Sequence, residues 1–267
     1  MGEQPANSCT ASEALLNYIQ KGFPIAPKWS IIACLVLLAI FVFIGTQDAQ
    51  GAAWVNNFNS FAASTVQSWR NPALTQVMCA LSVIGSELGS TLIALALVVW
   101  LAIRRRWDDF LYCLGNYAVF LAISQGAKFI FCTPRPVDQA IVELPLTFSY
   151  PSGHSGTSLM LAFIISMLAI VYFRKRGKSD TAGIVIMVVL VLLALCVALS
   201  RVYLGVHWGI DLIGGWCVAL AWGLPTFTWF VGQYPPARFQ GGSDPYGVKA
   251  IQEKRAGGKT DDEAAVE

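Results

Sequence analysis

The sequence predicts an all-α integral membrane protein: a bundle of six transmembrane helices, with an interfacial helix between the first two spans. Hydrophobic residues make up 55% of the 267 residues and charged residues only 13%, whereas soluble domains carry about 25% charged residues. The apolar residues form continuous runs, each long enough for the roughly 20-residue helix that crosses a hydrocarbon core of about 30 Å. These runs lack the alternating pattern of a membrane β-barrel, so the predicted spans are helices.

The order of the spans follows from where charges interrupt the apolar sequence. Residues 1–28 are fairly polar, so the first run is interpreted as a retained span and not as a cleavable signal peptide. We therefore expect a cytoplasmic segment over 1–28, a membrane domain over 29–234 and a disordered cytoplasmic tail over 235–267. The predicted spans are 29–47, 71–103 (interrupted by Glu87), 110–127, 155–173, 181–200 and 212–234.

The segment between the first two spans carries aromatic residues at helical spacing, namely Trp54, Phe58, Phe61 and Trp69, together with Thr65. This pattern predicts a short helix on the outer membrane interface, with its rings at the level of the lipid headgroups. A helix packed on the end of the bundle explains the pattern equally well.

The basic residues predict the orientation of the bundle. Most of them fall on the side that also carries both termini, which the positive-inside rule makes cytoplasmic in a plasma (inner) membrane. The opposite side has only Arg70, Lys128, Arg135 and Arg201. The cytoplasmic set comprises Lys21, Lys28, Arg104, Arg105, Arg106, Arg174, Lys175, Arg176, Lys178, Arg238, Lys249, Lys254 and Arg255.

Helix geometry places the outward ionisable residues at one depth. A helix rises 1.5 Å per residue, so Lys128 lies about 30 Å from Asp108, and His154 lies about 30 Å from Arg174. Ionisable groups at the edge of the lipid are unfavourable and by default mark a functional site. The other residues at this depth are Arg135, Arg201, His207 and Asp211.

The types of residue at this depth suit a phosphate group. Lys128, Arg135 and Arg201 have no nearby acidic run to pair with, and arginine contacts phosphate oxygens bidentately. Ser152 and Gly153 come just before a predicted helix, whose N-terminal amides and dipole favour an anion. We therefore expect these five residues to bind phosphate.

Both histidines of the chain fit a phosphoryl transfer through a phosphohistidine. His207 and Asp211 share a helix face at spacing i, i+4, so the carboxylate can hold one imidazole nitrogen protonated and leave the other as the nucleophile. His154 is then available as the general acid for the leaving alkoxide. No metal or other cofactor is predicted, since the cations and amides supply the charge stabilisation.

Three linked motifs carry a resemblance to a known family. They are "KFIFCTPRP" over 128–136, "PSGH" over 151–154 and "SRVYLGVHWGID" over 200–211. In order and spacing the chain resembles the type-2 phosphatidic acid phosphatase family of integral-membrane lipid phosphate phosphatases, and it matches every motif position. The resemblance implies the same roles for the histidines, for Asp211 and for the phosphate-binding residues.

The resemblance implies a lipid phosphate substrate for an enzyme whose site faces away from the cytoplasm among membrane lipids. Bacterial members of the family act on phosphatidylglycerol phosphate, phosphatidate, undecaprenyl diphosphate or lipid A, and the motifs do not distinguish these. A lipid phosphotransferase and a non-catalytic lipid-binding membrane protein are the alternatives. Net charge is +2 with no basic patch, so no nucleic-acid partner is expected. Glu87, near the outer edge of its span, either lines the headgroup pocket or simply reaches the interface.

Overall fold

The computed structural model describes residues 27–234, so most of the predicted N-terminal segment and the tail over 235–267 lie outside the described residues. All regular structure in 27–234 is helical, as predicted. The helices are α2 (Lys28–Ala49), α3 (Ala53–Gln67), α4 (Pro72–Ile84), α5 (Glu87–Ile103), α6 (Trp107–Phe131), α7 (Gly153–Lys175), α8 (Thr181–Tyr203) and α9 (Gly209–Gly232), with a short 3-10 turn, η1, at Val137–Gln139.

Five of these helices are long and apolar enough to cross a membrane: α2, α6, α7, α8 and α9. The pair α4 and α5 makes a sixth span if the two are counted together, but they are bent by 48°. The Ser86 hydroxyl caps α5 by accepting a hydrogen bond from the Gly89 amide at 2.9 Å. The predicted span 71–103 is therefore broken, because a serine cap starts a second helix inside it.

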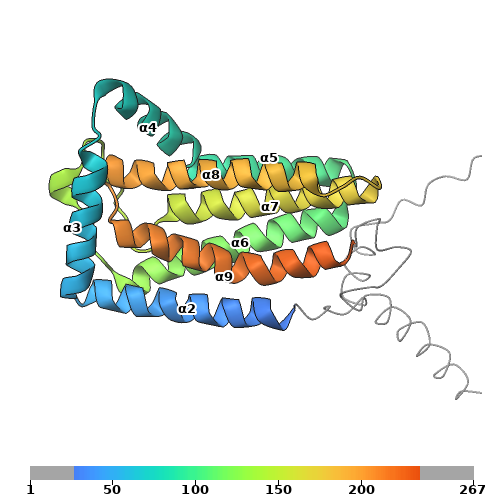
Figure 1. Ribbon diagram of the computed structural model, residues 1–267, viewed down its shortest axis with the longest axis horizontal. Coiled ribbons are helices and arrows are strands. Elements are labelled where there is room, and N and C mark those ends of the chain that lie inside the picture. The colour runs from blue at the N-terminus through green and yellow to red at the C-terminus, as the bar shows by residue number, and fades with distance from the viewer. Residues whose placement is uncertain (1–26, 235–267) are drawn as a thin grey trace, which may run out of the picture.

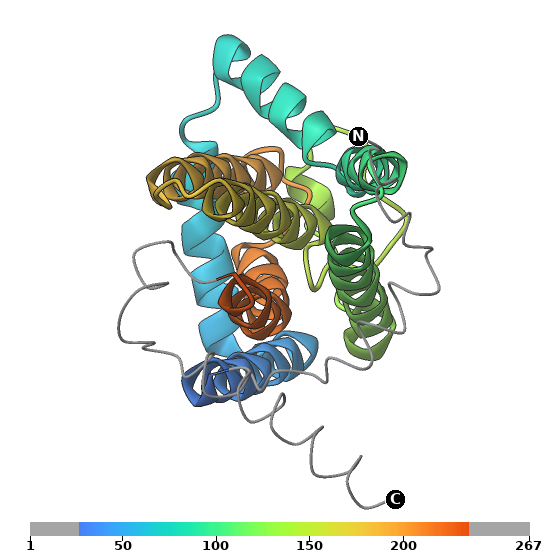
Figure 2. The same ribbon diagram turned by 90° about the vertical axis from the view of Figure 1, so that its right-hand side faces the viewer.

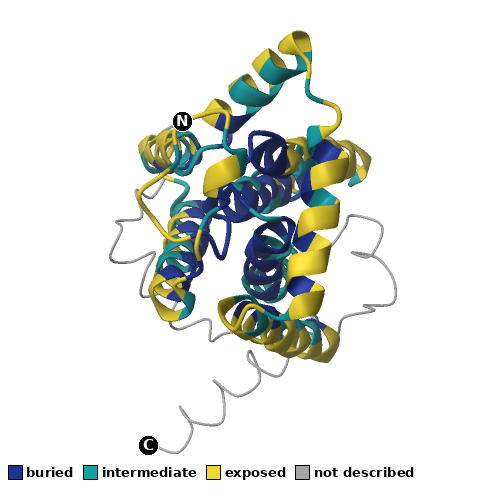
Figure 3. Cartoon of the chain, turned by 90° about the vertical axis from the view of Figure 1, so that its left-hand side faces the viewer, coloured by how far each residue is buried: buried dark blue, intermediate teal, exposed yellow. Residues whose placement is uncertain are grey.

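Helix α7 lies in the middle of the bundle, in contact with α5, α6, α8 and α9 (Figure 2). Residues of α7 and α9 are mostly buried, whereas α2 and α5 expose apolar side chains on the outside (Figure 3). A bundle with an apolar exterior matches a lipid surrounding. The central position of α7 means that its first residues meet the ends of several other helices.

Helix α3 lies across one end of the bundle (Figure 1). Its Val55 and Asn59 are buried, and the Asn59 side chain accepts a hydrogen bond from the Ile210 amide at 3.1 Å. Trp54, Phe58 and Phe61 are exposed on the other face, while Trp69 follows the end of the helix. Helix α3 thus packs on the end of the bundle and also presents aromatic side chains outward, and its position at the membrane interface stays a prediction.

Candidate active site

The motif residues meet at the end of the bundle that α3 crosses. The C-terminal ends of α6 and α8 and the N-terminal ends of α7 and α9 lie there (Figure 1). The Ser152 amide donates to the Asp211 carbonyl at 3.0 Å, and the Lys128 ammonium donates to the Pro151 carbonyl at 2.9 Å. The three motifs, spread over 128–211, therefore form one connected site, as the predicted common depth requires.

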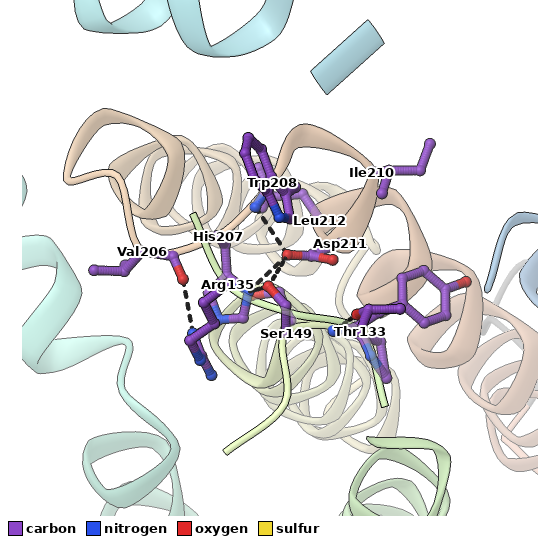
Figure 4. A network of polar contacts seen from close by, with 12 residues as sticks. Thr133, Arg135, Ser149, Val206, His207, Trp208, Ile210, Asp211 and Leu212 are labelled. Atoms are coloured by element: carbon purple, nitrogen blue, oxygen red, sulfur yellow. Dashed lines mark hydrogen bonds and ion pairs between the residues drawn. The ribbon is translucent and has the colours of Figure 1, made fainter. Parts of the chain in front are cut away.

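His207 and Asp211 form the predicted pair (Figure 4). His207 Nδ1 lies 3.0 Å from Asp211 Oδ2, and both side chains are almost completely buried. A carboxylate at this distance favours the proton on Nδ1 and leaves the lone pair on Nε2, where it accepts a hydrogen bond from Arg135. On the other side of the ring, Nη1 of Arg135 lies 3.1 Å from Nε2.

The turn between α8 and α9 fixes the position of His207. The Val206 amide bonds to the Arg201 carbonyl at 3.0 Å and the Gly205 amide to the Val202 carbonyl at 3.1 Å, which is the Schellman arrangement. Gly205 has φ +73°, and a Cβ there would overlap the Gln139 carbonyl, so only glycine fits. The "LGVH" sequence thus ends α8 just after Arg201 and turns the chain so that His207 precedes α9.

Asp211 accepts hydrogen bonds from two further donors that were not predicted from the sequence. The Ser149 hydroxyl donates to Oδ2 at 2.5 Å, and the Trp208 amide donates to the same oxygen at 2.8 Å (Figure 4). Ser149 lies in the loop before "PSGH", and only the tertiary contact identifies its partner. These donors fix the carboxylate and orient it toward the imidazole.

Arg135 is bound by neutral acceptors along the loops around His207. Its Nε donates to the Thr147 carbonyl at 2.7 Å and its Nη1 to the Val206 carbonyl at 2.7 Å. Its Nη2 contacts Thr147 Oγ1 at 3.1 Å and the Phe148 carbonyl at 3.2 Å. Burial lowers the pKa of the Arg135 guanidinium, while Asp211 and Glu87 oppose that change. The side chain therefore keeps a positive charge beside the imidazole with no carboxylate contact to neutralise it.

Lys128 is buried, with 2% of its surface exposed, at the end of α6. Its ammonium donates to the carbonyls of Phe148 at 3.1 Å and Pro151 at 2.9 Å. A buried ammonium held only by carbonyls keeps its charge uncompensated, which favours a nearby anion.

Arg201 extends from α8 toward α4. Its Nη1 donates to the Ser82 hydroxyl, and its Nε is buried without a hydrogen-bond partner among the described residues. The contact between Ser82 and Arg201 was also not predicted from the sequence. The unpartnered Nε is a buried donor available to an acceptor from outside the protein.

The fourth outward cation, Arg70, has a different role. Its Nε donates to the Tyr203 carbonyl and its Nη2 to the Gln139 carbonyl, each at 2.9 Å. Arg70 thereby caps the C-terminal end of α8 and ties it to η1.

The start of α7 has the form expected of an anion site. Ser152 is the N-cap residue, and its hydroxyl accepts from the Ser155 amide at 3.5 Å. Gly153 is buried, and His154, half-buried, makes no side-chain hydrogen bond within the described part of the chain. Glu87 lies against Gly153, so the structure brings it into the site together with the predicted motif residues.

The surroundings of His207 keep its imidazole neutral. Burial lowers its pKa well below the ordinary value of 6.5, and the charges of Arg135, Lys128 and Arg201 act in the same direction. A neutral imidazole with its lone pair on Nε2 is the nucleophilic form.

Across residues 27–234, no group of three or more His, Cys, Asp or Glu side chains is arranged to hold a metal ion.

The chain is similar to known membrane phosphatases. It is 28% identical to phosphatidylglycerophosphatase B of Bacillus subtilis over 57% of this chain and 72% of the relative. It is 27% identical to an undecaprenyl-diphosphatase of Sulfolobus acidocaldarius over 38% of this chain and 45% of that protein. The crystal structure of a transmembrane PAP2-type phosphatidylglycerolphosphate phosphatase from Bacillus subtilis superposes with a TM-score of 0.61 at 23% identity, covering 75% of this chain and 94% of that one.

The region that contains all three motifs also matches a family model. Residues 109–235 match the model described as the PAP2 superfamily. This range holds the ends of α6, α7, α8 and α9 and therefore the whole His207–Asp211 environment. The fold match to a PAP2-type structure and the sequence match agree, and the protein carries a PAP2 superfamily domain in a multi-pass membrane bundle.

Proposed function

We propose that the protein is a lipid phosphatase that hydrolyses a phosphomonoester or diphosphate of a membrane lipid through a phosphohistidine on His207. One observation carries this proposal: Arg135 contacts a buried His–Asp pair, Lys128 and Arg201 lie at the same end of the bundle, and all three cations are held by neutral oxygens. Such an arrangement has uncompensated positive charge next to a nucleophile, which suits a phosphate ester.

In the first step, the His207 Nε2 lone pair attacks phosphorus and the P–O bond to the lipid alkoxide breaks. His154 donates its proton to the departing alkoxide, which leaves as the free alcohol. Lys128, Arg135, Arg201 and the first amides of α7 stabilise the equatorial oxygens during the transfer. Asp211 stabilises the positive charge that develops on the imidazole.

In the second step, water attacks the phosphorus of the phosphohistidine and the P–N bond breaks. His154, now neutral, accepts a proton from the water as the new P–O bond forms. The products are orthophosphate and the original His207–Asp211 pair. His154 is placed for both roles at the first turn of α7, where its ring is free of other hydrogen bonds in the described chain.

We place the site on the extracytoplasmic face of the inner membrane, with both termini in the cytoplasm. The opposite end of the bundle carries Arg104–Arg106 and Arg174–Arg176, as the positive-inside rule requires of a cytoplasmic end. A reporter fused after Arg106 should read cytoplasmic and one inserted in the 137–148 loop should read outside. The reverse result would move the site to the cytoplasm.

The substrate class is tested with purified protein and a panel of lipid phosphates. Phosphatidylglycerol phosphate, phosphatidate, undecaprenyl diphosphate and lipid A are compared by phosphate release, in excess EDTA. The names of the relatives favour phosphatidylglycerol phosphate and undecaprenyl diphosphate as the first two to try. We expect release from at least one lipid without added metal. Activity that is lost in EDTA and restored by Mg²⁺ would contradict a metal-independent enzyme. With a radiolabelled lipid phosphate, transfer of the label to a lipid acceptor instead of release as free phosphate would indicate a transferase.

A further inference from the structure

Glu87 is a site residue that the three motifs do not include. It is the first residue of α5, immediately after the bend that separates α5 from α4. Its Oε2 accepts a hydrogen bond from the Gln125 side-chain amide on α6 at 2.7 Å. The bend and the amide together hold the carboxylate at the end of the bundle where the cations lie.

The carboxylate of Glu87 lies against the backbone of Gly153. A Cβ on residue 153 would coincide with the Glu87 carboxylate, with Oε1 as the nearest atom. Glycine at this position therefore makes room for the Glu87 side chain. Gly153 is also the first residue of α7, whose N-terminal amides are proposed to bind phosphate.

Glu87 acts on the phosphate-binding cations without contacting them. Its negative charge opposes the lowering of the Arg135 pKa by burial, yet no ion pair joins Glu87 to any described residue. A carboxylate at this place opposes a second anion at the start of α7. The site thus combines a cluster of cations with one fixed negative charge at its border.

We propose that Glu87 is a further site residue that weakens the binding of phosphate at the start of α7 and thereby favours release of the orthophosphate product. The inference rests on the proposed phosphatase function. A lipid substrate has an apolar chain that contributes its own binding energy, whereas orthophosphate binds through its charge alone. Repulsion from Glu87 weakens the binding of both phosphate groups, but the apolar chain still holds the lipid in the membrane, whereas orthophosphate has no other attachment and is released.

The test compares competitive inhibition by orthophosphate and by orthovanadate in the purified full-length protein. Glu87→Gln keeps the size of the side chain and an acceptor for Gln125, and removes the charge. We expect its inhibition constants for both anions to fall about tenfold. Glu143→Gln is the matched control, because it removes an exposed carboxylate from the loop before α7, and it should leave both constants unchanged.

Inhibition constants in Glu87→Gln that stay within about twofold of wild type, or that rise, would overturn the proposal. A selective rise in KM for the lipid would overturn it too, because Glu87 would then contact the lipid headgroup. If Glu87→Gln does not elute as a folded protein, Glu87→Ala is measured with the same criteria. A wild-type enzyme that neither anion inhibits would instead contradict the phosphate site itself, so the two failures are distinguishable.

Discussion

The two ends of the helix bundle treat their charged residues in opposite ways. At the end where α2 begins and α9 ends, Arg174 pairs with Asp180 at 2.6 Å and Arg106 pairs with Asp109 at 2.6 Å. At the other end, Lys128 and Arg135 are bound by carbonyl oxygens, and Arg201 is bound by a serine hydroxyl. Neutral acceptors position a cation but leave its charge available, whereas a carboxylate neutralises it. The comparison distinguishes structural charges from charges prepared for an anionic ligand.

The largest expected effect is the loss of activity on replacing Asp211 at the site end, compared with replacing Asp180 at the opposite end. Asp211→Asn removes the charge that orients His207 and stabilises its imidazolium, so we expect kcat to fall roughly 10⁴-fold. Asp180→Asn breaks the pair with Arg174 and should change kcat by less than about threefold, with a lower thermal stability. The measurement is phosphate release from the best lipid of the panel. Equal losses in the two variants would remove the distinction between the ends.

A smaller loss of activity is expected on replacing Lys128 at the site end, compared with replacing Arg174 at the opposite end. Lys128→Gln removes a buried charge with no carboxylate partner, and we expect kcat/KM to fall about 10²- to 10³-fold. Arg174→Gln should keep kcat/KM within about threefold while it lowers the melting temperature. Kinetics and thermal unfolding on the same preparations separate the two outcomes. Loss of stability without loss of activity in Lys128→Gln would show that this lysine is structural.

The smallest effect is a change in the titration of His207. Burial and three cations lower its pKa, so its imidazole should stay neutral as the pH falls through 6.5, and the nucleophile should persist there. Removing a cation in Arg135→Gln should move this pKa upward. The chain has only two histidines, so NMR of ¹⁵N-histidine protein gives two rings, and His154→Gln assigns them. A His207 that titrates at 6.5 in wild type would contradict the burial seen here.

The fold was largely predictable, because the lipid environment demands long apolar helices. The ends of α6, α7, α8 and α9 lie within about four residues of the predicted spans. The bend between α4 and α5 was not predicted, although Ser86 followed by Glu87 is a helix-start pattern. A run of apolar residues predicts the length of a membrane span, but it does not show where a capping residue ends one helix and starts another within that span.

The site was predictable only where residues of the motif act directly. The contact between His207 and Asp211 was predicted, but not its geometry: His207 lies before the N-cap of α9, so the two residues do not share a helix face, and the local turn at the start of α9 brings Nδ1 to the carboxylate. Ser149, Ser82 and Gln125 contact Asp211, Arg201 and Glu87 through packing between segments far apart in the chain. Serine and glutamine occur commonly at such positions, so their type alone gives no signal.

Trapping the enzyme during turnover tests the role of His207 most directly. A lipid carrying ³²P in its phosphate is mixed with the enzyme and quenched in alkali after a few milliseconds. We predict protein-bound label that is stable in alkali and labile in acid, as a P–N bond is, located in the peptide with His207 and absent from His207→Gln. Label in the His154 peptide, label retained in His207→Gln, or a full burst of alcohol release with no labelled protein would contradict a His207 nucleophile.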